Sequence, residues 1–326
     1  TEDGKTTVQI ELDYPAKTQG PVIEEMVRAK LVEAGIPADV KISQNIIAHE
    51  VQRGVKVFDS VRNIIAVSSG KGGVGKSTVS ANLALALQQE GAKVGLLDAD
   101  VYGPSQPTML GITDRPYSVD GKTLEPMIAH GLQVASVGVL IDPDQPMIWR
   151  GPLAVSALQQ LLKQTNWKDL DYLIVDMPPG TGDIQLSLSQ EVPLTGAVVV
   201  TTPQDIALMD ARKGLVMFEK VNVPILGIIE NMATHICSKC GHEEHIFGEG
   251  GAAKMAEQYG VELLGELPLD INIRLSMDKG EPIVISEPDS KVAQAYRDIA
   301  RKLAIAVSKK NKDYSAKMPS IKVSDT

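Results

Sequence analysis

The glycine-rich stretch GKGGVGKST at residues 70–78 constrains the fold of this chain more than any other segment. It fits the pattern G-x-x-x-x-G-K-[ST], in which backbone N–H groups of a loop surround phosphate oxygens. An apolar run at 63–68 precedes this loop and a helical pattern at 76–90 follows it. A strand before the loop and a helix after it are the context that such a phosphate loop requires, and the helix start adds the positive end of its dipole. The sequence therefore predicts a site for the phosphate groups of a nucleotide.

The residues of the phosphate loop have distinct expected roles. Lys76 should reach the β- and γ-phosphates, and the Ser77 hydroxyl should bind Mg²⁺. Lys71 is a second lysine within the loop, and some phosphate-loop enzymes receive positive charge at the γ-phosphate from a neighbouring subunit. An exposed loop lysine without that role is the alternative. The residues expected around the nucleotide are Gly70, Lys71, Gly72, Gly73, Val74, Gly75, Lys76, Ser77 and Thr78.

Two carboxylates follow later apolar runs of the chain. Asp176 ends the run at 172–175, where a carboxylate can hold the water shell of magnesium, and the Pro-Pro-Gly turn at 178–180 could respond to the γ-phosphate. Asp100 ends the Asp-Ala-Asp segment at 98–100 and is placed to orient an attacking water; a loop or helix-cap role is the alternative for either residue. No N-K-x-D guanine-reading sequence occurs, which favours ATP over GTP. The expected catalytic residues of this ATPase are Lys71, Lys76, Asp100 and Asp176.

Short apolar runs that alternate with helical patterns predict an α/β fold. The runs lie at 64–67, 94–97, 172–175, 197–201 and 225–229, and the helical patterns at 76–90, 151–165, 205–220, 251–259 and 288–308. Strands joined by crossover helices form a mostly parallel sheet with helices on both faces. A separate β-α-β pattern precedes the phosphate loop. We expect a small α+β domain at 1–47, a linker at 48–61, an ATPase domain at 62–308 and a flexible polar tail at 309–326.

Both cysteines of the 326-residue chain lie in the segment HICSKCGHEEH at 235–245, as Cys237 and Cys240. Four thiolates commonly hold a [4Fe–4S] cluster, and a twofold dimer would bring two such pairs together. Zinc is the alternative, held by four cysteines across the dimer or by both cysteines with His242 or His245 of one chain. A redox dithiol is less favoured, because the motif does not open a helix. From spacing alone, cluster and zinc are equally supported.

The composition of the chain argues against several classes of partner. A formal net charge of −9 opposes broad attraction to nucleic acid or anionic lipid, and an aromatic content of 4% opposes base-stacking platforms. No apolar run approaches the length of a membrane span, and the opening TEDGKTTVQ has neither the basic start nor the apolar core of a signal peptide. We therefore expect a cytoplasmic protein without nucleic-acid or membrane partners.

Several motifs resemble those of the deviant phosphate-loop ATPases, the MinD/ParA class, whose mark KGGxGK[ST] occurs here at 71–77. The chain is similar in particular to the Mrp/ApbC family of iron–sulfur cluster carrier ATPases. The resemblance runs from about residue 63 to about residue 307. Besides the phosphate loop and the CxxC, it is carried by DADVYGPSQPTMLG at 98–111, WRGPL at 149–153, DMPPGTGD at 176–183, TTPQDIALMDARKG at 201–214, ENM at 230–232, IFGEGG at 246–251 and LLGELPLD at 263–270.

The resemblance implies roles for individual residues. It implies a homodimer in which Lys71 contacts the nucleotide of the partner subunit, and it places Asp100 and Asp176 in two switch segments that sense the nucleotide. Asn231 would approach the adenine, with the loop of Pro268 nearby.

The resemblance also implies a function, and it favours a cluster over zinc at the two cysteines. The protein would bind a [4Fe–4S] cluster between two subunits, hydrolyse ATP slowly, receive clusters from donors and transfer them to apo-proteins. Residues 1–47 resemble the later part of the MIP18-like (DUF59) domain that precedes many of these ATPases. A MinD/ParA-like positioning ATPase and a zinc-stapled regulatory dimer with weak ATPase activity are the alternative functions.

Overall fold

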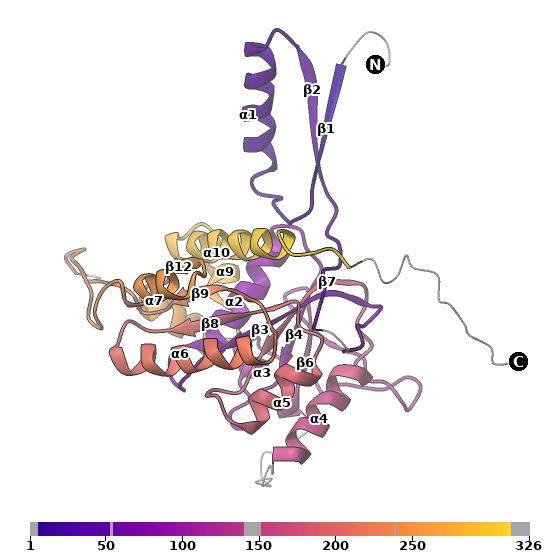
Figure 1. Ribbon diagram of the computed structural model, residues 1–326, viewed down its shortest axis with the longest axis vertical. Helices are drawn as coiled ribbons and strands as arrows, with labels where there is room; N and C mark the ends of the chain where they lie inside the picture. Colours follow the sequence, from indigo (N-terminus) through magenta and orange to yellow (C-terminus); the bar gives the residue numbers. More distant parts are fainter. Residues whose placement is uncertain (1–5, 53–54, 140–150, 238, 314–326) are drawn as a thin grey trace, which may run out of the picture.

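An eight-stranded sheet forms the centre of the computed structural model, which describes residues 6–52, 55–139, 151–237 and 239–313 (Figure 1). Its strands are β3 (Val61–Ser68), β4 (Val94–Asp98), β5 (Met127–Ala129), β6 (Leu132–Ser136), β7 (Leu170–Asp176), β8 (Gly196–Thr201), β9 (Ile225–Glu230) and β12 (Leu263–Glu266). Their spatial order is β12-β9-β8-β3-β7-β4-β6-β5, and only β5 and β6 pair antiparallel. The predicted α/β fold with a mostly parallel sheet is confirmed.

Helices cover both faces of this sheet, so the sheet separates two apolar core layers, one on each face. One face packs against α2 (Lys76–Gln89), α8 (Ile271–Asp278), α9 (Ile283–Ser286) and α10 (Lys291–Ser308). The other packs against α4 (Gly151–Gln164), α5 (Asp183–Glu191), α6 (Asp205–Lys220) and α7 (Gly251–Tyr259). The helix α2, which begins at the phosphate loop, is apolar around most of its circumference because α10 covers the side that faces away from the sheet. The short helix α3 (Gln106–Met109) follows β4.

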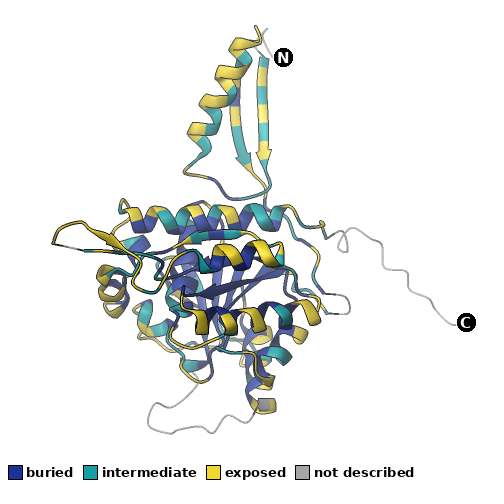
Figure 2. Ribbon diagram, turned by 60° about the vertical axis from the view of Figure 1, so that its left-hand side comes forward, coloured by how far each residue is buried: buried dark blue, intermediate teal, exposed yellow. Residues whose placement is uncertain are grey.

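The first elements of the chain form a separate β-α-β unit. Strands β1 (Thr6–Leu12) and β2 (Ala38–Gln44) pair in parallel, and α1 (Gly20–Glu33) connects them. The unit stands apart from the large sheet, and Figure 2 shows it mostly in the colours of exposed and half-buried residues. No residue of α1 is buried, and Met26 and Val32 are among its exposed apolar side chains.

A buried carboxylate joins this unit to the far end of α2. Glu90 caps the carboxyl end of α2, and its side chain accepts hydrogen bonds from the Thr18 hydroxyl at 2.6 Å and the Thr18 backbone N–H at 3.0 Å. Arg301 of α10 forms an ion pair with the same carboxylate. Because a buried charge is stable only with partners, this contact fixes the loop between β1 and α1 against the domain of the large sheet.

The segments around 48–52 and 311–313 also pack on the sheet domain. The backbone N–H of Glu50 donates to Asn311 O at 2.9 Å, and that of Asp313 donates to Ala48 O at 3.0 Å. The side chain of Gln52 is buried and donates to Ser189 O at the end of α5. Residues 311–313 therefore depart from the flexible tail predicted from residue 309, because backbone pairing holds them despite their polar side chains. Residues 314–326 of that predicted tail lie outside the described residues.

The contact at Glu90 predicts a large effect of one substitution on stability. In Glu90→Ala, Arg301 loses its buried partner and Thr18 loses both acceptors. We expect the free energy of unfolding in urea to fall by about 3 kcal/mol. Glu33→Ala, which removes the exposed ion pair between Glu33 and Lys30, is the control and should change it little. An equal effect of the two substitutions would contradict this account of the junction.

Candidate nucleotide and metal sites

The phosphate loop connects β3 to α2, and its glycines are required by close neighbours. Gly75, with φ of 83°, precedes α2, and a Cβ at this position would lie 2.2 Å from the Asn231 Nδ2. A Cβ on Gly70 would lie 2.1 Å from the carbonyl carbon of Asp210 in α6. Both positions therefore exclude any larger residue, and the loop backbone runs directly against α6.

A buried lysine and a buried aspartate meet at the start of α2. The Lys76 Nζ lies 2.5 Å from the Asp176 Oδ1 at the end of β7 and 3.7 Å from the Asp100 Oδ2. It also lies 3.2 Å from the Ser77 Oγ. The two aspartates are distant in the sequence from Lys76 and Ser77, and the structure brings them together because β3, β7 and β4 are neighbours in the sheet and end at the same edge.

Asp98 is a site residue that the sequence analysis did not select. It ends β4 and accepts hydrogen bonds from the backbone N–H groups of Ser105 and Gln106, each at 3.1 Å, and from the Ser136 hydroxyl at 2.9 Å. Burial, and next the charge of Asp176, raise the pKa of its carboxyl to about 7. The buried Asp98 carboxylate thus fixes the backbone of the segment 98–106 through these hydrogen bonds. The Asp-Ala-Asp pattern contained both carboxylates, and both are buried, but only the fold shows that Asp98 accepts from the backbone N–H groups of Ser105 and Gln106.

Asp100 is also buried, at 7% exposure, and lies two residues further along the same segment. Its Oδ1 accepts hydrogen bonds from the backbone N–H groups of Tyr102 and Gly103, both at 3.2 Å. The carboxylate is therefore held in one orientation while its Oδ2 faces Lys76. This arrangement is consistent with the predicted role of orienting a water, which stays a prediction.

The cluster around Asp176 suits magnesium. The Ser77 hydroxyl and the Asp176 carboxylate both contact Lys76, so a hydroxyl and a carboxylate, two of the oxygen ligands that Mg²⁺ prefers, lie in one small region. Within the described residues, the buried Oε1 of Gln106 has no hydrogen-bond partner there. An acceptor without a donor in this place fits a hydrated cation.

Asn231 and Pro268 lie in two loops that are hydrogen-bonded to each other. Asn231 follows β9, and its Nδ2 donates to Val74 O in the phosphate loop at 2.8 Å. The backbone N–H of Ala233 donates to Leu267 O at 2.9 Å, next to Pro268. The segment of Asn231 therefore contacts the phosphate loop directly, and the segment of Pro268 is bonded to it through Ala233. The contact with adenine stays a prediction.

Cys237 and Cys240 lie in a short hairpin formed by β10 (His235–Ile236) and β11 (Glu243–Glu244). The backbone N–H of Cys237 donates to His242 O at 2.9 Å, which closes the turn. Cys237 is partly exposed and Cys240 is exposed. Hydrogen bonds from the backbone N–H of Lys239, then from the backbone and side chain of Cys240, lower the pKa of the Cys237 thiol. The hairpin thus favours a thiolate, the form that binds metals.

The histidines near this hairpin do not converge on the cysteines. A ring nitrogen of His235 faces Leu269 O at 3.1 Å, and one of His245 faces Ala233 O at 3.0 Å. Among the residues that the structure describes, no group of three or more cysteine, histidine or acidic side chains is arranged to hold a metal. A single-chain zinc site with His242 or His245 is therefore not formed in this arrangement.

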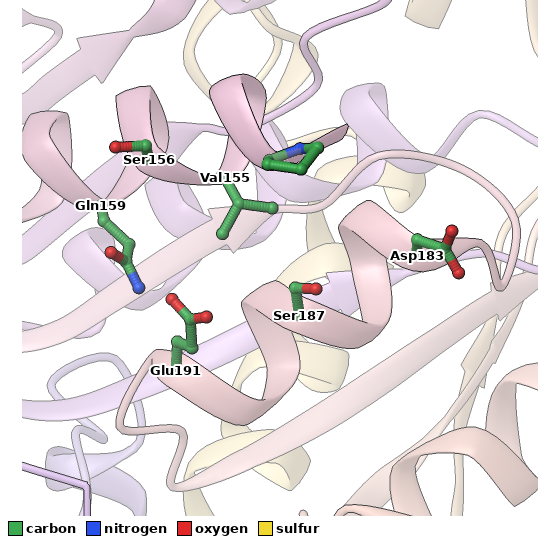
Figure 3. Close-up of a pocket in the computed structure, with 7 residues that line it drawn as sticks. Val155, Ser156, Gln159, Asp183, Ser187 and Glu191 are labelled. Atoms are coloured by element: carbon green, nitrogen blue, oxygen red, sulfur yellow. The ribbon is translucent and has the colours of Figure 1, made fainter. Parts of the chain in front are cut away.

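A cavity of about 480 Å³ with a mixed polar and apolar lining lies between α4 and α5, apart from the phosphate-loop residues (Figure 3). Its lining residues are Pro152, Val155, Ser156, Gln159, Asp183, Ser187 and Glu191. Of the WRGPL motif, Pro152 lies in this wall, whereas Trp149 and Arg150 fall outside the described residues.

No helix in the described parts of the chain is long and apolar enough to cross a membrane.

Comparisons with known proteins agree with this geometry. The family model described as NUBPL iron-transfer P-loop NTPase, of the ParA type, matches residues 60–304. The iron-sulfur cluster carrier protein of Salmonella typhimurium is 56% identical over 303 residues, which cover 91% of this chain and 82% of that protein.

Two solved structures share the fold. The nucleotide-binding protein of Archaeoglobus fulgidus in complex with ADP has a TM-score of 0.63 and 37% identity, covering 72% of this chain and 92% of that one. The cell division ATPase MinD of Pyrococcus furiosus has a TM-score of 0.56 and 26% identity, covering 74% and 98%.

The raised pKa of Asp98 predicts how stability without nucleotide depends on pH. The folded state keeps a proton on this carboxyl up to about pH 7, whereas the unfolded chain releases it near the ordinary value of 3.8. The free energy of unfolding should therefore fall as pH rises across this window. In Asp98→Asn this decline should flatten, as measured by urea unfolding at several pH values. Asp120→Asn is the control, because hydrogen bonds lower the pKa of Asp120 to about 2, below the window; an unchanged slope in Asp98→Asn would contradict the prediction.

Proposed function

Because the chain belongs to the family of NUBPL iron-transfer P-loop NTPases, we propose that it is an ATP-dependent carrier of iron–sulfur clusters. In this role it receives a [4Fe–4S] cluster as cargo from donor proteins and passes it to apo-proteins. The observation that carries the proposal is the presence, in one chain, of a phosphate loop with its buried lysine–aspartate pair and of an exposed two-cysteine hairpin. The naming of a 56% identical relative as an iron-sulfur cluster carrier supports it.

Hydrolysis of ATP follows from the positions of the chain's own side chains. Lys76 leaves Asp176 and contacts the β- and γ-phosphates, and Asp100 orients the attacking water for in-line displacement. Magnesium, held by the Ser77 hydroxyl with Asp176 facing its water shell, offsets phosphate charge when bound. Lys71 is exposed, so it is free to reach the nucleotide of a partner subunit.

Binding of the cluster requires two copies of the chain. Each hairpin supplies Cys237 and Cys240, and a [4Fe–4S] cluster takes four thiolates. A twofold homodimer completes the site by bringing two identical hairpins together, without any other cysteine. The arrangement of the histidines supports this over a zinc site within one chain.

A short stretch of chain connects the two sites. Asn231 holds the carbonyl of Val74 in the phosphate loop, and the same segment enters the cysteine hairpin at His235. A nucleotide that moves the loop would therefore act on the hairpin through these few residues. Coupling requires a difference in cluster affinity between nucleotide states, with slow hydrolysis setting the time between them.

The remaining expectations form part of the same proposal. We place the protein in the cytoplasm without nucleic-acid or membrane partners, consistent with a net charge of −9. Residues 1–47 would be part of a MIP18-like domain. A positioning ATPase of the MinD/ParA kind remains the alternative, but it gives the cysteine hairpin no role. A zinc-stapled dimer would use the same four cysteines.

Reconstitution with iron and sulfide under anaerobic conditions tests the cargo. We expect a brown protein with cluster absorbance, bound as one cluster per dimer and transferable to an apo-acceptor. Cys237→Ala and Cys240→Ala should each lose the cluster but retain ADP binding, because the hairpin lies outside the phosphate loop. His242→Ala is the control and should keep the cluster. Retention in both cysteine variants would refute the assignment, and a zinc-stapled dimer would show zinc and no colour.

A mixing experiment tests the role of Lys71 across the dimer. Lys71→Ala should reduce ATP turnover with little change in ADP affinity, and Lys76→Ala should weaken nucleotide binding. In a mixed dimer of the two variants, one site combines an intact Lys76 with the intact Lys71 of the other subunit, so partial turnover should return. Lys213→Ala, on the exposed surface of α6, is the control. Failure of the mixture to regain turnover would show that Lys71 acts within its own subunit.

A further inference from the structure

Gln106 connects the first switch segment, residues 98–106 with Asp100, to the proposed magnesium-binding region around Ser77 and Asp176. It is buried at the start of α3, and its backbone N–H donates to the Asp98 Oδ2 at 3.1 Å. Its side-chain Nε2 donates to Ser77 O and to the Asp176 Oδ2, both at 2.9 Å. A single side chain thus bridges the two residues expected to face magnesium.

The other half of this amide group has no partner. Within the described structure, the Oε1 of Gln106 is buried and accepts no hydrogen bond. Reversing the amide would not help, because Oε1 would then face the Ser77 carbonyl and the Asp176 carboxylate, which are both acceptors. An unsatisfied buried acceptor is unfavourable, so its presence at a ligand site indicates a donor that arrives with the ligand.

The neighbouring acceptors are already occupied by protein groups. When Lys76 turns from Asp176 to the phosphates, the Asp176 Oδ1 still has the Ser80 hydroxyl as a donor, and the Asp176 Oδ2 still has Gln106. Magnesium in nucleotide sites keeps several of its water molecules, and each water brings two O–H donors into the site. The Oε1 of Gln106 is therefore available as an acceptor for one of them.

We propose that Gln106 is a positioning residue whose Oε1 accepts a hydrogen bond from a water molecule of the magnesium shell. This role rests on the nucleotide site of the proposed function and is independent of iron–sulfur transfer. It would also make the segment 98–106 sensitive to the metal, because the same residue is held by Asp98 through its backbone.

Gln185 offers an internal comparison. It is also buried, and its Oε1 likewise has no partner among the described residues. Its Nε2, however, contacts the Ser68 hydroxyl, which can either donate or accept. The amide of Gln185 can therefore reverse and satisfy its Oε1 within the protein, whereas that of Gln106 cannot.

Calorimetric titration of Mg²⁺ into the complex of the full chain with ADP tests the proposal. Gln106→Met keeps the side-chain length but removes both the Oε1 acceptor and the Nε2 donor, and we expect the affinity for Mg²⁺ to fall about tenfold. The affinity for ADP in EDTA should change by less than about twofold, because a role limited to water binding leaves metal-free nucleotide contacts intact. Gln185→Met is the matched control and should leave the affinity for Mg²⁺ unchanged.

A second variant separates the acceptor from the donor. Gln106→Glu retains acceptor oxygens but cannot donate to Ser77 O or to Asp176, and it should bind Mg²⁺ at least as tightly as the unaltered protein. Equal weakening in Gln106→Met and Gln106→Glu would overturn the proposal, since the donor contacts would then be what matters. So would an unchanged affinity in Gln106→Met, or an equal loss of ADP affinity with and without Mg²⁺. Absence of ADP binding by the unaltered protein would instead refute the nucleotide site itself.

Discussion

The buried contact between Lys76 and Asp176 is the interaction on which the rest of the structure depends. Both charges lie in the protein interior, where each requires a partner of opposite sign. Phosphate groups compete with Asp176 for the same ammonium group, so binding of nucleotide must provide Asp176 with a new partner. In the proposed function, a magnesium ion that arrives with the nucleotide would meet that requirement. The sheet order places β3, β7 and β4 side by side, and this order alone makes the exchange of partners possible.

Three hydrogen-bonded connections lead away from this contact. Gln106 links Asp176 to the first switch segment, and Asn231 links the phosphate loop to the segment that enters the cysteine hairpin. The third is α2 itself, which begins at Lys76 and ends at Glu90, where it holds the β-α-β unit. Each connection is a physical route by which a change of partner at Lys76 could reach another part of the chain. A connection couples two sites only if its element has two conformations and nucleotide binding favours one of them.

The sequence predicted the features that depend on local spacing. The phosphate loop follows from a short motif, and the α/β class follows from apolar runs that alternate with helical patterns. The roles of Gln106 and Glu90 were not predictable, because their partners are 70 and 211 residues away in the chain. Asp98 was overlooked for a related reason: both carboxylates of the Asp-Ala-Asp segment are buried, and only the fold shows that Asp98 accepts from Ser105, Gln106 and Ser136. The paired backbone at 311–313 was hidden by polar side chains, which indicate exposure but not backbone hydrogen bonding.

The cysteine hairpin shows why an incomplete site suits a carrier. Backbone N–H groups already stabilise the Cys237 thiolate in one chain, so a monomer presents a prepared half-site rather than an unformed one. In the proposed homodimer, four such ligands would hold a four-iron cluster more strongly than two, so the affinity for cargo would depend on how closely two chains approach. A site completed within one chain would lack this control, because its ligands would stay together in every nucleotide state. Exposure of Cys240 serves the same end, since a cluster that is to be handed over must be reached by the thiolates of its recipient.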